Sequence, residues 1–395
     1  MGSKIILFDK KEDCCGCTAC VNICPKSAIA MQPDGLGFLY PVIDDTKCIK
    51  CGLCKKVCAF NAAYDKNDNF EEPYVYAVRH KDMNEIATSR SGAVFIALSD
   101  WILANNGVIY GVGYTGHFRV VHKRAVNKVE RDEFKGSKYV QSDLKDIFKQ
   151  VKSDLQNDRI VLFSGTPCQV AGLKSYLTLS GIKIEKLYLI DIVCHGVPSP
   201  YFWRDYIEYI ENKAKQKVIG VDFRNKSKFG WTAHKESFKF EDTYTYTYTY
   251  TFYQHIVFRR SCGICHFTNL QRPSDITIGD FWGWQKVDPE FNADDKGVSL
   301  VLINTLKGQK LFEGVKGDIH YIQTDTQHCL QPNLQHPSVI HPKRDDFEKD
   351  YIRHGFVYVA KKYGNLGWKY EVLDKLRKIK NESKFLSWIW RKFKN

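Results

Sequence analysis

Cysteines at a fixed spacing near the N-terminus are the residues of this chain most suited to metal chemistry. The pattern C-x2-C-x2-C-x3-C is formed first by Cys14, Cys17, Cys20 and Cys24, and again by Cys48, Cys51, Cys54 and Cys58. Three cysteines placed three residues apart let one curled loop direct three sulfurs at one centre. Zinc sites usually show two CxxC pairs with a longer spacer. The spacing therefore favours two iron–sulfur clusters over zinc.

The fourth cysteine of each run is expected to bind the cluster of the other run, as in bacterial two-cluster ferredoxins. This assignment gives a first set, Cys14, Cys17, Cys20 and Cys58, and a second set, Cys48, Cys51, Cys54 and Cys24. The stretch PDGLGFLYPVID between the runs predicts a hairpin that joins the two halves. Cys15 is out of register with the ligands and is interpreted as a packed bystander.

Four further cysteines form a dispersed third set. Cys168 and Cys194 each follow a short apolar run, residues 160–163 and 187–193, which predicts a buried strand ending in a Gly/Pro turn. Cys262 and Cys265 form a C-x2-C pair. Cysteines at neighbouring strand ends and a C-x2-C loop are a plausible four-ligand site, and buried structural cysteines are the alternative. Cys329 stands alone.

Longer motifs surround this third set. SGTPCQVAGL, DIVCHGVPSP and RRSCGICHFTNLQRPSDITIGDFWG resemble the C-terminal domain of the coenzyme F420-reducing hydrogenase/dehydrogenase β-subunit family, and ATSRSGAVFIALSDWILANNG and GSKYVQSDL resemble its N-terminal domain. The resemblance spans roughly residues 74–283, with the ferredoxin module fused in front. It implies an FAD-containing iron–sulfur oxidoreductase in which the third set, Cys168, Cys194, Cys262 and Cys265, binds a 4Fe–4S cluster near the flavin.

Candidate flavin-binding residues lie in two of these motifs. Ser91 and Gly92 form a turn opening an amphipathic helix, whose N-terminus can hold a phosphate, or they form an ordinary helix cap. The family usually has Gly-Gly where this chain has Gly92-Ala93. Gly279 and Asp280 end a strand pattern; the glycine permits close approach to a cofactor, and the acid could instead cap the next turn. No GxGxxG follows a strand, so a Rossmann site is unsupported.

Other polar residues are candidates for the chemistry of the flavin and substrate. Lys138 matches a family lysine that could meet a phosphate or the reduced flavin, and a surface lysine is the alternative. His195 is the candidate catalytic proton donor, and the alternative is a histidine that only hydrogen-bonds its own loop. Residues 223–235 mix cations with aromatics and predict either the lining of an anionic substrate pocket or plain surface.

The predicted fold class is α+β, a bacterial-ferredoxin-like N-terminal module followed by a mixed α/β flavin and iron–sulfur domain. Its parts are a ferredoxin-type domain over 1–65, a polar linker over 65–73, a domain over 74–150 like the N-terminal domain of the family, a domain over 151–345 like its C-terminal domain and carrying the third cluster, and a basic helical tail over 346–395. The repeat TYTYTYTYT, residues 243–251, predicts one arm of a hairpin. The tail mixes Trp with Lys and Arg, which suits either membrane-surface contact or packing on the domain.

Charge and hydropathy restrict the partners. The 395-residue chain has a formal charge of +13, and three oxidised clusters would lower it to roughly +7. A basic surface fits an acidic ferredoxin-like donor or acceptor. Nucleic acid binding would rest on charge alone and is not predicted. No apolar run approaches the length of a membrane span, and the N-terminus lacks a signal-peptide pattern, so a cytoplasmic location is expected.

These patterns predict an iron–sulfur flavoenzyme. Electrons would pass from a ferredoxin-like donor through 4Fe–4S clusters to FAD and then to a small-molecule substrate, either an F420-like cofactor or a polysaccharide-related metabolite. The alternative is a non-catalytic electron-relay subunit of a larger redox complex. The ligands encode neither the substrate nor the direction of electron flow.

Overall fold

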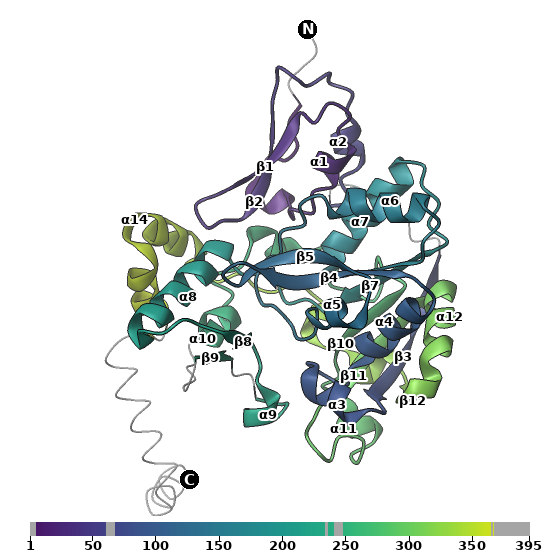
Figure 1. The fold of residues 1–395 in the computed structure, drawn as a ribbon. Helices are drawn as coiled ribbons and strands as arrows, with labels where there is room; N and C mark the ends of the chain where they lie inside the picture. Colours follow the sequence, from purple (N-terminus) through teal and green to yellow (C-terminus); the bar gives the residue numbers. More distant parts are fainter. Residues whose placement is uncertain (1–4, 61–67, 234–235, 241–247, 365, 367–395) are drawn as a thin grey trace, which may run out of the picture.

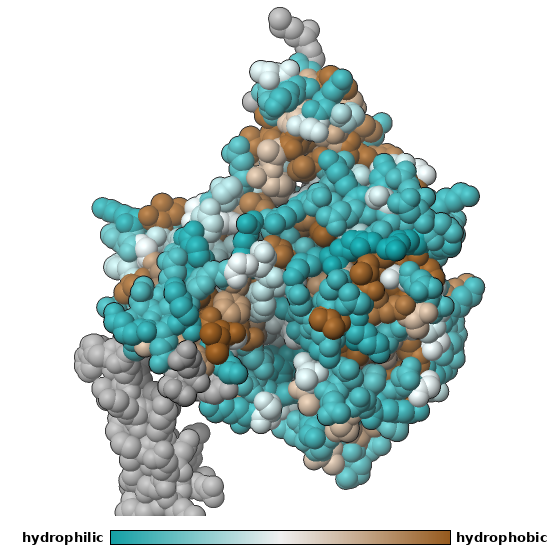
Figure 2. All heavy atoms as spheres, in the orientation of Figure 1, coloured by the Kyte–Doolittle hydropathy of each residue, from teal (hydrophilic) through white to brown (hydrophobic). Residues whose placement is uncertain are grey.

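An N-terminal module sits on a larger domain built around one sheet (Figure 1). The computed structural model describes residues 5–60, 68–233, 236–240, 248–364 and 366. In Figure 2, hydrophobic residues gather on the visible face where the module joins the larger domain. None of the described helices is long and apolar enough to cross a bilayer.

The N-terminal module contains the predicted hairpin. Strands β1 (Ile29–Pro33) and β2 (Leu39–Ile43) pair antiparallel. The turn between them is held by Asp34, whose carboxylate accepts hydrogen bonds from the backbone N–H groups of Leu36 and Phe38, both at 3.0 Å. Short helices α1 (Ala19–Ile23) and α2 (Leu53–Lys56) follow the curled loops of the two cysteine runs. The hairpin prediction is confirmed.

The larger domain has an eight-stranded mixed sheet in the order β12-β3-β11-β10-β7-β6-β4-β5. Its strands are β3 (Asn69–His80), β4 (Val108–Thr115), β5 (Arg119–Ala125), β6 (Val161–Gly165), β7 (Leu187–Ile192), β10 (Ile276–Asp280), β11 (Ser299–Thr305) and β12 (Ile319–Thr324). The four central strands, β10, β7, β6 and β4, are parallel, and the outer pairs are antiparallel. Their carboxyl ends therefore meet at one edge, where open α/β sheets usually bind ligands. The predicted α+β fold class is confirmed.

The central strands are apolar because helices cover both faces of the sheet. In β6, Val161 and Phe163 pack in the core beneath α6 and α7, whereas Leu162 packs on the opposite face with α4 and α12. The helices of the larger domain are α3 (Met83–Thr88), α4 (Val94–Ala104), α5 (Lys128–Asp132), α6 (Ile147–Gln156), α7 (Pro167–Leu179), α8 (Pro200–Ala214), α9 (Lys226–Phe229), α10 (Tyr248–Tyr253), α11 (Trp284–Val287), α12 (Leu306–Val315), α13 (Thr326–Cys329) and α14 (Arg344–Lys362). A small pair, β8 (Gly220–Asp222) and β9 (Ser237–Lys239), lies beside the main sheet.

The predicted boundary at residue 150 falls between β5 and β6, which belong to the same sheet. Three elements differ from the sequence expectations. Strand β3 begins at Asn69, inside the predicted linker, because it pairs with β11 and β12. Part of the Tyr/Thr repeat is helical in α10, and residues 241–247 lie outside the described residues. Helix α14 begins at Arg344 and packs against α8; residues 367–395 lie outside the described part.

Candidate redox site

The two cysteine sets of the N-terminal module line two separate hollows. The first hollow is bordered by the first set, Cys14, Cys17, Cys20 and Cys58, together with Cys15 and Cys54. The second is bordered by the second set, Cys24, Cys48, Cys51 and Cys54. This grouping matches the predicted exchange of the fourth cysteine between runs. Four thiols around each hollow are the donor set that a 4Fe–4S cluster requires.

The same backbone curl recurs in both cysteine loops. Gly16 and Lys50 stand two residues after the first cysteine of their runs, and both have positive φ, 75° and 57°. Thr18 and Gly52 stand directly after the second cysteine, with φ of 65° and 75°. Left-handed residues at matched positions bend each loop around its hollow, so that successive sulfurs face the same centre.

The thiols of each set are close enough to raise one another's pKa. Burial raises the pKa of Cys20 well above its usual range, and the charges of Cys17, Cys14, Cys58 and Cys54 raise it further. Burial likewise raises the pKa of Cys54, with added repulsion from Cys51 and Cys48. Such sets ionise together only when a metal compensates the charge. Among the described residues, no group of three His, Cys, Asp or Glu is arranged to hold a single metal ion.

The third set converges from three segments at the carboxyl edge of the sheet. Cys168 lies in the first turn of α7 after β6, Cys194 follows β7, and Cys262 and Cys265 flank the end of the 3-10 helix Arg260–Ile264. Burial raises the pKa of Cys194 well above its usual range, and the charges of Cys262, Cys168 and Cys265 raise it further. Burial also raises the pKa of Cys262 to about 12 and that of Cys265 to about 11. These four residues fit a third cluster.

The first and third sets adjoin through Cys15. The Cys15 thiol is hydrogen-bonded to those of Cys168 and Cys17, and the Cys168 bond is the main reason that its pKa lies well above the usual range. The hydrogen bond from Cys15 is also the main cause that lowers the pKa of Cys168 to about 7. A Cβ on Gly172 of α7 would lie 2.8 Å from Cys17 Sγ, so the module rests directly on α7. Cys15 is buried as expected, but it lies between two cysteine sets.

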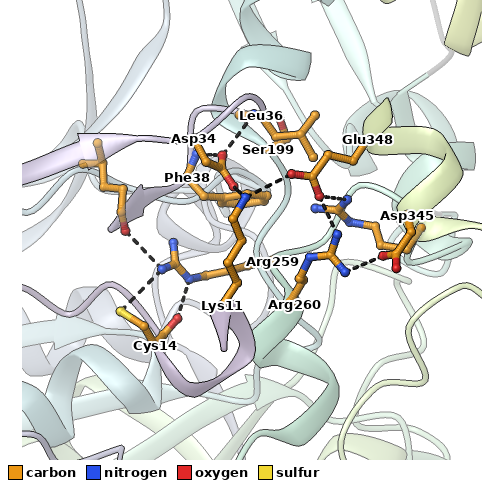
Figure 3. Close-up of polar contacts among 12 residues, drawn as sticks. Lys11, Cys14, Asp34, Leu36, Phe38, Ser199, Arg259, Arg260, Asp345 and Glu348 are labelled. Atoms are coloured by element: carbon orange, nitrogen blue, oxygen red, sulfur yellow. Dashed lines mark hydrogen bonds and ion pairs between the residues drawn. The ribbon is translucent and has the colours of Figure 1, made fainter. Parts of the chain in front are cut away.

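Arg259 ties the third-set loop to the first set, and the sequence gives no signal for this contact. Its Nε donates to the Cys14 carbonyl oxygen at 2.9 Å, and its Nη2 lies 3.7 Å from Cys14 Sγ (Figure 3). Nη2 also donates to the Leu39 carbonyl at 3.1 Å, and Nη1 donates to Gln141 Oε1 at 3.0 Å. The guanidinium is fully buried, over the ring of Tyr40. One cation thus contacts both halves of the molecule beside the first hollow.

Ser91 and Gly92 lie in the turn before α4. Ser91 Oγ donates to the carbonyl of Val298 at 2.5 Å. A Cβ on Gly92 would lie 2.1 Å from the carbonyl oxygen of Val78, so glycine is needed there for the turn to reach the sheet. Helix α4 begins only at Val94, after Ala93 with φ of 63°. The family glycine at that position suits this left-handed conformation.

Gly279, Asp280 and His195 meet at the carboxyl edge of the sheet, beside Cys194. A Cβ on Gly279 would lie 2.9 Å from Val193 Cγ2, so Gly279 is closely packed against the segment that leads to Cys194. The Asp280 carboxylate accepts a hydrogen bond from Arg224 Nη1. Burial lowers the pKa of His195, as do the charges of His255 and Arg224, and Asp280 opposes them.

Lys138 is placed differently from the other candidates. Its Nζ donates to the carbonyls of Glu133 at 2.8 Å and Lys135 at 2.9 Å. Burial lowers the pKa of Lys138 to about 7. The two hydrogen bonds hold the Lys138 amino group against main-chain oxygens just after α5. The neighbouring residue, Tyr139, is hydrogen-bonded to Arg224.

Two parts of the chain match models of known protein families. Residues 158–327 match the family model for the C terminus of the beta subunit of coenzyme F420 hydrogenase/dehydrogenase, and residues 13–62 match that of a 4Fe–4S dicluster domain. Among solved structures, the chain is similar to a chain of the F420-reducing NiFe hydrogenase complex from Methanosarcina barkeri, studied by xenon derivatization. The two chains are 15% identical with a TM-score of 0.46, and the similarity covers 76% of this chain and 94% of that chain. No curated protein matches.

The chain is an iron–sulfur protein with a redox role. Its predicted resemblance is confirmed, because one part of the chain matches a 4Fe–4S dicluster domain and another matches the C terminus of the coenzyme F420 hydrogenase/dehydrogenase β subunit. The match over residues 158–327 contains all four cysteines of the third set, and the match over residues 13–62 contains both N-terminal sets. The family indicates oxidoreductase activity.

Proposed function

We propose that this protein is an iron–sulfur flavoprotein oxidoreductase that takes electrons from a ferredoxin-like donor and reduces a small-molecule substrate at FAD. The observation that carries the proposal is that the three cysteine sets follow one another from the N-terminal module to the carboxyl edge of the sheet. The second set lies outermost, the first set adjoins the third through Cys15 and Cys168, and the third adjoins Asp280 and His195.

The second set is the proposed point of electron entry. Cys51 is exposed, whereas Cys15 and Cys17 of the inner region are buried against α7. When bound, 4Fe–4S clusters supply one-electron transfer, and a flavin converts single electrons into the pair that a substrate takes up. The three cysteine sets would hold the clusters in the order second, first and third.

His195 is the proposed proton-transfer residue. It directly follows Cys194 and lies near Asp280, and an imidazole can hold and release a proton near neutral pH. Asp280 and Arg224 stand beside it as an ion pair that fixes the local charge. Ser91, Gly92, Lys138, Gly279 and Asp280 remain the proposed surroundings of the flavin, with an F420-like cofactor or a polysaccharide-related metabolite as the proposed substrate classes.

Anaerobic stopped-flow reduction of the purified full-length chain tests this function. A reduced ferredoxin should bleach the cluster absorbance first and the flavin absorbance afterwards, and an added substrate should restore the flavin colour. Restoration only by a partner protein would make the chain a subunit that relays electrons. If protein reconstituted with clusters binds no FAD, the proposed flavin chemistry is overturned.

A further inference from the structure

Three cationic side chains meet beside the proposed flavin surroundings. Arg90 precedes Ser91 in the turn before α4, Arg224 follows β8, and Lys226 opens α9. Lys226 Nζ donates to the carbonyl of Ser91 at 3.1 Å, which places α9 against that turn. In Figure 2 the surface is hollowed between the part of the molecule that carries α9 and the part that carries α3.

Both arginines have buried N–H groups without a partner. Arg90 Nε and Nη2 and Arg224 Nε make no hydrogen bond to any described residue. The Arg90 side chain is only 12% exposed and that of Arg224 only 3%. A buried donor left unsatisfied costs about 1–3 kcal/mol, and more when it is charged. Three such donors in one place indicate that a ligand supplies the acceptors.

The local charges do not balance within the cluster. The carboxylates that face these cations are Asp280, paired with Arg224, and Asp222, which lies 3.5 Å from Arg90 Nη1 and is half exposed. The charge of Arg224 lowers the pKa of Arg90, after burial, and burial and the charge of Arg90 lower the pKa of Lys226 to about 7. An anion placed among the three side chains would relieve this repulsion.

We propose that Arg90, Arg224 and Lys226 bind the phosphate groups of an organic phosphate or diphosphate. A guanidinium presents planar paired donors that match phosphate oxygens, and an ammonium adds a point charge from another direction. A multiply charged tetrahedral anion uses all three cations, whereas a single carboxylate would use one fork. Helix α4, which begins at Val94 four residues after Arg90, has no side-chain cap.

The phosphate has two sources, the pyrophosphate of the flavin or a phosphate on the substrate. The first source depends on the proposed flavin function, and the second does not. Full-length protein with its clusters intact would be compared with Arg90→Gln and Lys226→Gln. Lys228→Gln, on the exposed side of the same short helix, is the matched control. Iron content and the midpoint of thermal unfolding would establish that each variant is folded.

One arm measures binding of FAD and of riboflavin by fluorescence quenching. If the pyrophosphate of the flavin is the source of the phosphate, loss of one charge-assisted contact should weaken the binding of FAD about 10- to 100-fold and leave the binding of riboflavin unchanged. The other arm titrates inorganic diphosphate into the flavin-loaded protein by calorimetry. Binding that both variants lose, with FAD affinity unchanged, would assign the cluster to the substrate.

Failure of the inference and failure of the proposed function are separable. Wild-type protein that binds neither FAD nor riboflavin would overturn the flavin function, while diphosphate binding that depends on Arg90 would still support the phosphate site. The inference is overturned if Arg90→Gln and Lys226→Gln bind FAD and diphosphate as wild type does, or if Lys228→Gln weakens binding equally.

Discussion

Arg259 and Cys14 are 245 residues apart in sequence, yet the arginine donates to the Cys14 carbonyl and its Nη2 lies 3.7 Å from the Cys14 sulfur. Arg259 directly precedes the loop that carries Cys262 and Cys265, so the cation stands between the first and third cysteine sets. A buried cation beside a ligand sulfur stabilises the reduced, more negative form of a cluster. This contact would therefore couple the position of the N-terminal module to the redox potential of a cluster bound by the first set.

The first prediction concerns the variant Arg259→Gln. Loss of the charge beside Cys14 should lower the reduction potential of the first cluster, on the order of 40 mV for an interaction of roughly 1 kcal/mol in a one-electron couple. An EPR-monitored redox titration would measure the shift. Arg260→Gln is the matched control, because Arg260 pairs with Asp345 and Glu348 instead of a thiol. Equal potentials in wild type and Arg259→Gln would contradict the assignment.

The second prediction concerns the third set. Replacing Cys194 by Ala should lower the iron content from about twelve to about eight atoms per chain, because one four-iron cluster is lost. Cys194 is preferred to Cys168 because the Cys15 thiol stands beside Cys168 and could replace it. The N-terminal clusters should still accept electrons while reduction of the flavin slows. The Cys329 thiol donates to the Thr326 carbonyl, away from the three cysteine sets, so Cys329→Ala should keep all its iron.

The third prediction concerns the close packing of the N-terminal module against α7. Gly172→Ala places a Cβ only 2.8 Å from the Cβ and the Sγ of Cys17, so these atoms must move apart. Although alanine favours a helix by roughly 1 kcal/mol over glycine, this substitution should lower the thermal midpoint and the iron occupancy of the first set. Thr178→Ala on the exposed side of α7 should raise the midpoint slightly. A Gly172→Ala protein with full iron and a higher midpoint would contradict the close contact.

The fourth prediction is a pH dependence of stability. His122 is buried, and burial lowers its pKa to about 4, so the folded state keeps it neutral while the unfolded state takes up a proton near pH 6.5. Its contribution to stability is present above pH 6.5 and is lost as the pH falls, by roughly 1 kcal/mol between pH 7.5 and 5.5. His122→Gln should flatten that part of the stability profile. An unchanged slope in unfolding measured at several pH values would argue against a neutral buried His122.

The cysteine geometry was open to prediction because it depends on local spacing and on strand ends. Four residues per run determine which sulfurs face one hollow, and Cys168 and Cys194 follow adjacent parallel strands, β6 and β7. Covalent spacing and the direction of parallel strands carry this information within short windows of sequence. Both predicted strands and the hairpin of the N-terminal module therefore have counterparts in the fold.

Long-range placement was not open to prediction in the same way. Arg259 and Arg90 have no local pattern that distinguishes them from surface arginines, because their partners come from distant segments. The boundary predicted at residue 150 lies between strands of one sheet, and sequence motifs do not reveal that β5 and β6 share it. Residues 223–235 remain open to two interpretations, the lining of a pocket for an anionic substrate or plain surface, and Arg224 among them is buried.

Iron and acid-labile sulfide, counted per chain in protein purified without oxygen, give the number of clusters that the chain holds. Three sets of four thiols predict about twelve irons and about twelve sulfides, with three cluster signals in EPR after reduction. About eight irons would remove the third cluster and with it the proposed route to the flavin. Protein that remains free of iron after anaerobic reconstitution would contradict the account.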